Sequence, residues 1–150
     1  MKVTVDASKL LSALKGIRQE LPSVVNASLD TLARAGVTNA QSSTVFKNQT
    51  GKLRKGIQFR VNGTYKREVF ADQPYAFYVE EGNNQKGPRI YPKNGKALRF
   101  VINGQVLFRK WVRSHGPLRF MRPARDLVES LIPVILLGDI ERLIARHTKG

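Results

Sequence analysis

The chain has 150 residues, and its 26 lysines and arginines outnumber its 11 aspartates and glutamates, which gives a formal net charge of +15 at pH 7. A chain of this length is typical of one domain and can bury roughly 70% of the surface that its unfolded form exposes, so we expect a single domain over residues 1–150. The absence of cysteine excludes disulfides, thiol nucleophiles and thiolate metal sites.

The first part of the chain is predicted to be helical over about residues 8–46. Asp6 or Ser8 can act as the N-cap, and apolar residues recur at helical spacing on both sides of Pro22. We expect Pro22 to end one helix or to lie in the first turn of the next. The small residues of the second apolar stripe, which would allow close packing, are Ala33, Gly36 and Ala40.

After the helices the apolar period changes to two, which predicts an antiparallel sheet over about residues 53–112. Asn62-Gly63 marks the first hairpin turn. A two-residue loop would place Ile57 opposite Glu68, whereas a three-residue loop places it opposite Val69. We prefer the three-residue loop because it puts apolar residues on the same face.

Two further segments complete the predicted sheet. Asn103-Gly104 predicts a hairpin with a two-residue loop that sets Phe100 against Leu107. The aromatic run Tyr75–Glu81 supplies a fifth strand, and a long loop follows over residues 83–96. The predicted fold is therefore α+β, with a five-stranded antiparallel meander flanked by N-terminal and C-terminal helices.

The last part of the chain is predicted to form helices over about residues 122–147. Pro123 suits a first helical turn, whereas Pro133 should break or kink the helix because it lacks a backbone donor. Gly138 is a second candidate break. The longest apolar run, Leu131–Leu137, is too short to cross a bilayer, so we expect no membrane association.

The residues that carry chemistry do not form a catalytic or metal-binding pattern. His115 and His147 are far apart and lack partners at helical spacing, and Gly51–Gly56 lacks the spacing of a phosphate-binding loop. Glu80 and Glu81 would point to opposite faces of a strand. They are either a solvated strand end, or an inward hydrogen-bond acceptor beside an outward partner for a neighbouring subunit's arginine. We expect no enzyme activity, no cofactor and no metal.

Nearly all of the positive charge lies in the middle of the chain. Between Lys47 and Arg125 there are eighteen lysines and arginines but only four carboxylates, which leaves a net charge of +14 there. Such a region is either a solvated surface or one that attracts polyanions, with contacts that weaken as salt is added. The residues that we expect to face DNA are Arg54, Lys55, Arg60, Lys66, Arg67, Lys96 and Arg99.

A series of short motifs runs from about residue 22 to residue 130. It consists of Ala40, Thr50–Arg54 (TGKLR) leading to Ile57, Tyr75-Ala76 with Val79-Glu80 and Gly82, Pro92-Lys93, Ala97–Phe100 (ALRF) and Phe120–Ala124 (FMRPA). Each motif is weak alone, but in this order they resemble the neck and tail-completion proteins of long-tailed bacteriophages, which are also described as minor tail or head-to-tail joining proteins.

The resemblance implies a non-enzymatic virion protein, made in the bacterial cytoplasm, that forms a ring at the head–tail junction around a channel for DNA. Its partners would be its own copies, other neck, tail-terminator or tail-tube proteins, and genomic DNA passing without sequence recognition. The expected subunit contacts are Tyr75, Tyr78, Glu80, Glu81, Lys86, Arg89, Tyr91 and Lys93. The alternatives are a non-specific nucleic-acid-binding protein that uses a basic sheet surface, and, third, a small basic nuclease.

Overall fold

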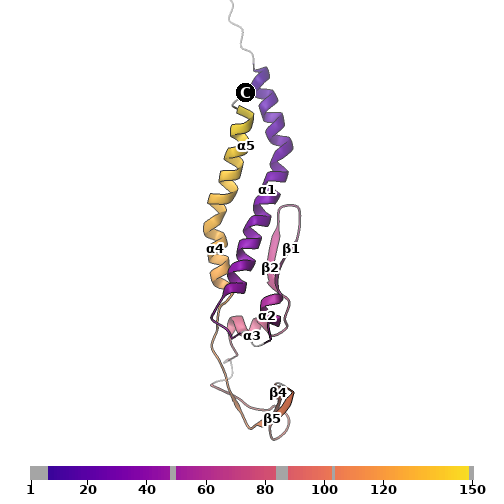
Figure 1. Cartoon of the computed structure of the whole chain (residues 1–150), viewed down its shortest axis with the longest axis vertical. Coiled ribbons are helices and arrows are strands. Elements are labelled where there is room, and N and C mark those ends of the chain that lie inside the picture. The colour runs from indigo at the N-terminus through magenta and orange to yellow at the C-terminus, as the bar shows by residue number, and fades with distance from the viewer. Residues whose placement is uncertain (1–6, 48–49, 84–87, 103, 149–150) are drawn as a thin grey trace, which may run out of the picture.

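Two helical arms lie side by side along most of the molecule (Figure 1). The computed structural model describes residues 7–47, 50–83, 88–102 and 104–148. One arm is α1 (Ser8–Ser42), and the other consists of α4 (Arg122–Ile132), the π-helical segment η1 (Pro133–Leu137) and α5 (Gly138–Thr148). The arms are antiparallel, because Arg146 near the end of α5 pairs with Glu20 near the start of α1 at 3.2 Å. Both ends of the described chain therefore lie at the same end of the molecule.

α1 continues through Pro22, so the prediction of a helix boundary there is wrong. The ring of Pro22 lies on an exposed side of the helix, and α4 and α5 pack along α1 on both sides of this position. Packing of this kind outweighs the loss of one backbone hydrogen bond. Ala7 occupies the N-cap position, whereas Asp6, one of the two predicted caps, lies outside the described residues.

In the second arm, the two residues predicted to interrupt the helix bound the π-helical segment. η1 begins at Pro133, and α5 begins at Gly138. The missing donor of a proline disturbs the α-helical ladder, and a single π-helical turn absorbs this disturbance while the helix continues. Pro123 is the second residue of α4, which confirms its predicted place in a first turn.

The stripe of small residues on α1 brings three elements together. Ala33, Gly36 and Ala40 are all buried. A Cβ added to Gly36 would lie 3.0 Å from a methyl group of Val128 on α4 and 3.6 Å from a methyl group of Val69 on β2 (Arg67–Ala71). The close packing predicted for this stripe is confirmed, and it holds β2 and α4 against the same turn of α1.

The strands form three separate antiparallel pairs, so the mixed α+β class is confirmed but the five-stranded meander is wrong. The pairs are β1 (Ile57–Val61) with β2, β3 (Arg89–Ile90) with β6 (Val112–Arg113), and β4 (Leu98–Ile102) with β5 (Gln105–Arg109). The segment predicted as the fifth strand is the helix α3 (Ala76–Glu81). Among the described residues, no strand pairs with both the first hairpin and the second.

The first hairpin differs from its predicted register by two residues. Ile57 lies opposite Ala71 and Phe59 opposite Val69, because a five-residue loop is closed by a 3.0 Å bond from the Asn62 amide to the Lys66 carbonyl. A shift of two residues keeps the same side chains on each face, which explains how the face pattern misled the prediction. The first residues of the predicted strand, 53–55, lie instead in the short helix α2 (Lys52–Lys55).

The second hairpin has the predicted register. Phe100 lies opposite Leu107 and Val101 opposite Val106. Gly104 has φ = 79°, a conformation that glycine adopts without strain, and Asn103 lies outside the described residues. The Asn-Gly signal was therefore sufficient to set this pairing.

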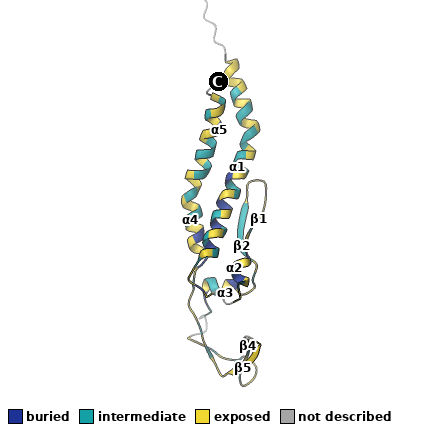
Figure 2. Cartoon of the chain, in the orientation of Figure 1, coloured by how far each residue is buried: buried dark blue, intermediate teal, exposed yellow. Residues whose placement is uncertain are grey.

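The core lies where α1 ends, beside α2 and α3 (Figure 2). Its largest fully buried side chains include Phe120 and Ile57. The ring of Phe46 meets that of Phe120 at 5.2 Å with an interplanar angle of 69°, which is an edge-to-face contact. Figure 2 shows that the strands β4 and β5, at the far end of the molecule, are mostly exposed.

Candidate functional site

Most of the motifs behind the family resemblance meet in this core, whereas Pro92-Lys93 and Ala97–Phe100 lie outside it. Leu53, Ala76, Phe120 and Ala124 come from four different elements or loops, and all are buried in the same cluster as Ala40. Because they are covered by the chain itself, these residues maintain the fold and do not form an exposed binding surface. The motif series is thus a signature of how the chain packs.

Glu80 also has a structural role. The end of α3 is held by the segment that leads into α4: the amide of Leu118 donates to the Val79 carbonyl at 3.1 Å, and that of Arg119 to the Glu80 carbonyl at 3.2 Å. The carboxylate of Glu80 accepts a further bond of 2.9 Å from the Met121 amide. These bonds satisfy carbonyls at the end of α3 that have no partner within the helix.

We expect Glu80→Ala to lower the free energy of unfolding by about 1–3 kcal/mol, because the partly buried amide of Met121 would lose its acceptor. Glu80→Gln keeps an acceptor oxygen and should lose less than about 1.5 kcal/mol. Urea denaturation of both variants measures the difference. Equal losses in the two variants would show that the hydrogen bond to Met121 is not what Glu80 contributes.

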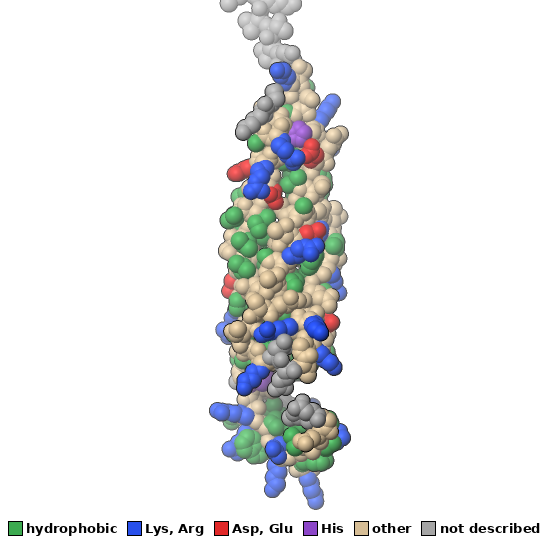
Figure 3. All heavy atoms as spheres, in the orientation of Figure 1, with side chains coloured by type: hydrophobic (Ala, Val, Ile, Leu, Met, Phe, Trp, Pro, Cys, Tyr) green, Lys and Arg blue, Asp and Glu red, His purple; other side chains and the backbone are tan. Residues whose placement is uncertain are grey.

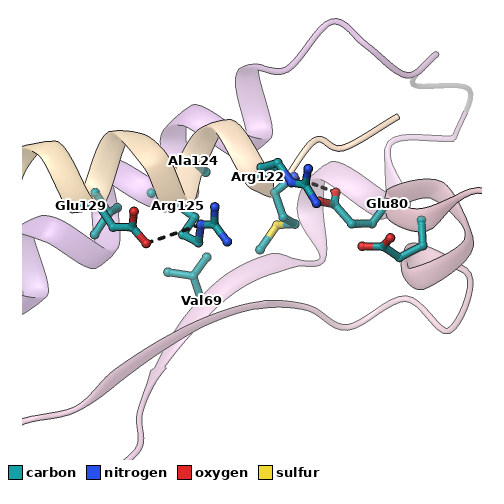
Figure 4. Close-up of a pocket in the computed structure, with 10 residues that line it drawn as sticks. Val69, Glu80, Arg122, Ala124, Arg125 and Glu129 are labelled. Carbon is teal, nitrogen blue, oxygen red and sulfur yellow. Dashed lines mark hydrogen bonds and ion pairs between the residues drawn. The ribbon is translucent and has the colours of Figure 1, made fainter. Parts of the chain in front are cut away.

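A cavity of about 380 Å³ lies between α3, β2 and α4 (Figure 4). Its apolar lining includes Val69 and Ala124, and its charged lining includes Glu80, Arg125 and Glu129. The cavity can accept an apolar side chain flanked by charges of either sign. In the part of the chain that the structure describes, no three histidine or carboxylate side chains gather as a metal site would require.

The charged rim of this cavity is partly neutralised within the chain. Arg125 pairs with Asp126 at 3.0 Å and with Glu129 at 3.5 Å. The hydrogen bond to Asp126, and then the negative charges of both carboxylates, raise the pKa of Arg125 above its ordinary value. Glu81, on the same rim, is exposed and forms no ion pair within the described residues, so it is free to meet another molecule.

The predicted subunit-contact residues fall into two groups. Tyr75, Tyr78 and Glu81 are exposed at α3, and Glu80 beside them is half-buried. The second group, at the far end of the molecule, is exposed and consists of Arg89, Tyr91 and Lys93. Lys86 lies outside the described residues. The seven described residues therefore lie in two separate places on the molecule, and their role in subunit contacts stays a prediction.

Two of the predicted DNA-facing arginines are held inside the protein, which corrects that assignment. Arg54 lies over the ring of Phe46, 5.3 Å from its centroid. Arg67 has a side chain only 9% exposed, pairs with Asp30, and donates to Asn26 at 3.0 Å. Sequence alone could not separate these cations from surface ones, because the contacts that hold them form only when the chain folds.

The remaining predicted DNA-facing residues are exposed but scattered. Arg60 forms a 2.9 Å ion pair with Glu68 across the first hairpin, which reduces its attraction for an anion. The others lie on α2, in the loop of the first hairpin, and near the second hairpin; they are Lys55, Lys66, Lys96 and Arg99. No single basic sheet surface joins them.

A different cluster of positive charge appears at the end of the molecule away from the described termini. We define residues 88–113 as the distal module; it contains β3, β4, β5 and β6. Its sequence has seven cations and no aspartate or glutamate; the cations are Arg89, Lys93, Lys96, Arg99, Arg109, Lys110 and Arg113. Figure 3 shows blue and green side chains gathered at this end.

The distal module also exposes large apolar side chains. Phe108 is 60% exposed and Trp111 is 41% exposed. Cations interleaved with exposed aromatic rings are typical of a surface that binds another molecule. The sequence analysis missed Phe108 and Trp111; the signal available was the long stretch of cations without any acid.

Hydrogen bonds between Asn83 and His115 join the two stretches of chain that flank the distal module. The amide of Asn83 donates to the His115 carbonyl at 3.0 Å, and the amide of His115 donates to the Asn83 side chain at 2.6 Å. Gly82 lies directly beneath, close to the backbone of residues 115–117. His115, exposed in this loop, therefore contributes its backbone to the fold.

Comparison of the chain with models of protein families, with curated proteins and with solved structures found no match. No helix within the described ranges is long and apolar enough to cross a bilayer. Functional proposals for this chain therefore depend on its own residues and geometry, together with the ordered motifs described above.

Proposed function

We propose that the chain is a structural virion protein that assembles with its own copies into a ring at a bacteriophage head–tail junction, leaving a channel for DNA. The observation that carries this proposal is the surface area. The chain exposes 11584 Å², about 1.5 times the roughly 7,700 Å² expected of a compact protein of its mass. A large exposed area is expected of an elongated subunit that buries part of its surface against other copies.

The exposed surface is also unusually apolar. Among the described residues, eighteen large hydrophobic side chains are exposed, whereas ten hydrophobic residues are buried. Most of the exposed ones gather in separate places, on the two helical arms, at α3 and on the distal module. Those on the two arms are Leu10, Leu11, Leu14, Ile132, Val134, Leu137 and Ile144. A ring needs two different patches on each subunit, since each copy contacts the next head to tail.

The proposed position at the head–tail junction is based on the motif series. The motif residues Leu53, Ala76, Phe120 and Ala124 converge on a single core, which supports reading the series as one fold signature and not as unrelated short matches. The partners proposed with it are neck, tail-terminator or tail-tube proteins, in a virion assembled in the bacterial cytoplasm.

We expect Val134→Ser to raise the dissociation constant of the assembly by about tenfold, because burial of a valine side chain in an interface contributes about 1.5 kcal/mol. Val134 is 68% exposed, so its replacement should leave folding unchanged. Val61→Ser, at 65% exposure on the first hairpin, is the matched control. Sedimentation over a range of concentrations measures both. A protein that stays monomeric at high concentration, or equal weakening in the two variants, would contradict the proposal.

Particles made without this protein test its place in the virion. Untailed heads beside free tails, seen by negative-stain microscopy, are the expected result. Normal tailed particles would overturn the proposed role even if the isolated protein forms rings, since ring formation alone does not place it at the junction.

A further inference from the structure

The strand pair β3–β6 places two arginines directly opposite each other. Arg89 pairs with Arg113, and Ile90 pairs with Val112. Residues directly opposite in an antiparallel pair share a face, and so do residues two positions along a strand. Tyr91 directly follows β3 and Trp111 directly precedes β6, and both line the same surface depression as Arg89 and Arg113. Two arginines and two aromatic residues form a four-residue patch.

The two arginines of this patch are not neutralised within the chain. Like charges directly opposite each other destabilise a strand pair. The distal module has no acidic residue, and neither Arg89 nor Arg113 forms an ion pair in the described ranges. The guanidinium of Arg89 lies 4.2 Å from the centroid of the Trp111 ring, a contact that orients the group and leaves its charge intact. An anion between the arginines would remove the repulsion.

The patch is open to a ligand. These four residues and Pro88 line a surface depression of about 600 Å³. Tyr91 is 57% exposed, and Trp111 is 41% exposed. An aromatic face beside paired cations suits a ligand that has both a negative charge and a flat ring, and single-stranded nucleic acid has both in every nucleotide.

We propose that the patch formed by Arg89, Tyr91, Trp111 and Arg113 binds single-stranded nucleic acid. Arg89 and Arg113 contact backbone phosphate, and an unpaired base stacks on the exposed ring of Tyr91. A duplex offers the same phosphates but keeps its base faces stacked on each other, so the site favours single strands. The site belongs to one copy of the chain and does not depend on ring formation.

The single tryptophan of the chain makes the site directly observable, because Trp111 lies within it. We expect a short oligothymidylate, added at low salt, to quench Trp111 fluorescence and to bind more tightly than a duplex with the same number of phosphates. Tyr91→Ala should weaken binding by about tenfold, within the range measured for loss of one stacked base, whereas Tyr91→Phe should retain it. Arg113→Gln should reduce the slope of log affinity against log salt by about 0.7.

Arg18→Gln is the matched control, since it changes the net charge equally at an exposed position on α1. It should leave fluorescence quenching and affinity unchanged, and circular dichroism establishes that every variant is folded. The proposal is overturned by the absence of binding at low salt, by equal binding of Tyr91→Ala and the unaltered protein, or by equal effects of Arg18→Gln and Arg113→Gln. Tighter binding of polyglutamate than of oligothymidylate would instead assign the patch to an acidic peptide.

Discussion

Replacement of Gly82 by alanine is expected to lower the free energy of unfolding by about 4 kcal/mol. Gly82 has φ = 80° and ψ = 174°, a conformation that is essentially restricted to glycine and costs other residues about 1–3 kcal/mol. An added Cβ would also lie 2.7 Å from the Gly116 carbonyl carbon, 2.7 Å from the Pro117 nitrogen and 2.9 Å from the His115 oxygen. Backbone atoms cannot rotate away, so overpacking adds about 1–3 kcal/mol. Urea denaturation measures the loss.

Gly104→Ala provides the control for backbone strain alone. Gly104 has nearly the same φ, 79°, but an added Cβ there would meet no atom within 4 Å. We expect a loss of about 1–2 kcal/mol, from the left-handed conformation only. Equal losses at Gly82 and Gly104 would show that the close approach of residues 115–117 does not constrain the base of the distal module.

Phe120→Ala should be comparably damaging, with an expected loss of about 3–5 kcal/mol. Its side chain is 1% exposed and is in edge-to-face contact with Phe46 at 5.2 Å, so truncation removes buried area and leaves a cavity. Thermal and urea denaturation both report this change. Because Phe120 lies in the core shared by the motifs, its loss should destabilise the whole helical part.

Phe108→Ala makes the same chemical change at a position that is 60% exposed on β5. We expect a change in unfolding free energy of no more than about 0.5 kcal/mol. If Phe108→Ala were as damaging as Phe120→Ala, the apolar face of the second hairpin would have to be part of the core of a single subunit, and its exposure would be wrong.

The segment at Tyr75–Glu81 shows why part of the fold could not be predicted. Tyr75, Phe77 and Val79 alternate as in a strand, yet Ala76, Val79 and Glu80 also fit one face of a helix. A run this short is compatible with both periods. The helical conformation is stabilised by the amides of Leu118, Arg119 and Met121, which donate hydrogen bonds to the end of α3. These contacts cannot be read from the local sequence.

Other elements were predictable because their signals are local. Asn103-Gly104 set the register of the second hairpin, and the small residues around Gly36 indicated where α1 would be approached closely. The candidate site was harder to predict from the sequence. Arg54 and Arg67 are chemically the same as the exposed cations, and only tertiary contacts with Phe46 and Asp30 show that they serve the fold.

The hydrogen bonds between Asn83 and His115 affect the way in which the molecule unfolds. Asn83 and His115 bring together the two stretches of chain on either side of the distal module, and the described strands of the module pair only with one another. The module is thus an insertion that can open as a separate cooperative unit while the helices stay folded.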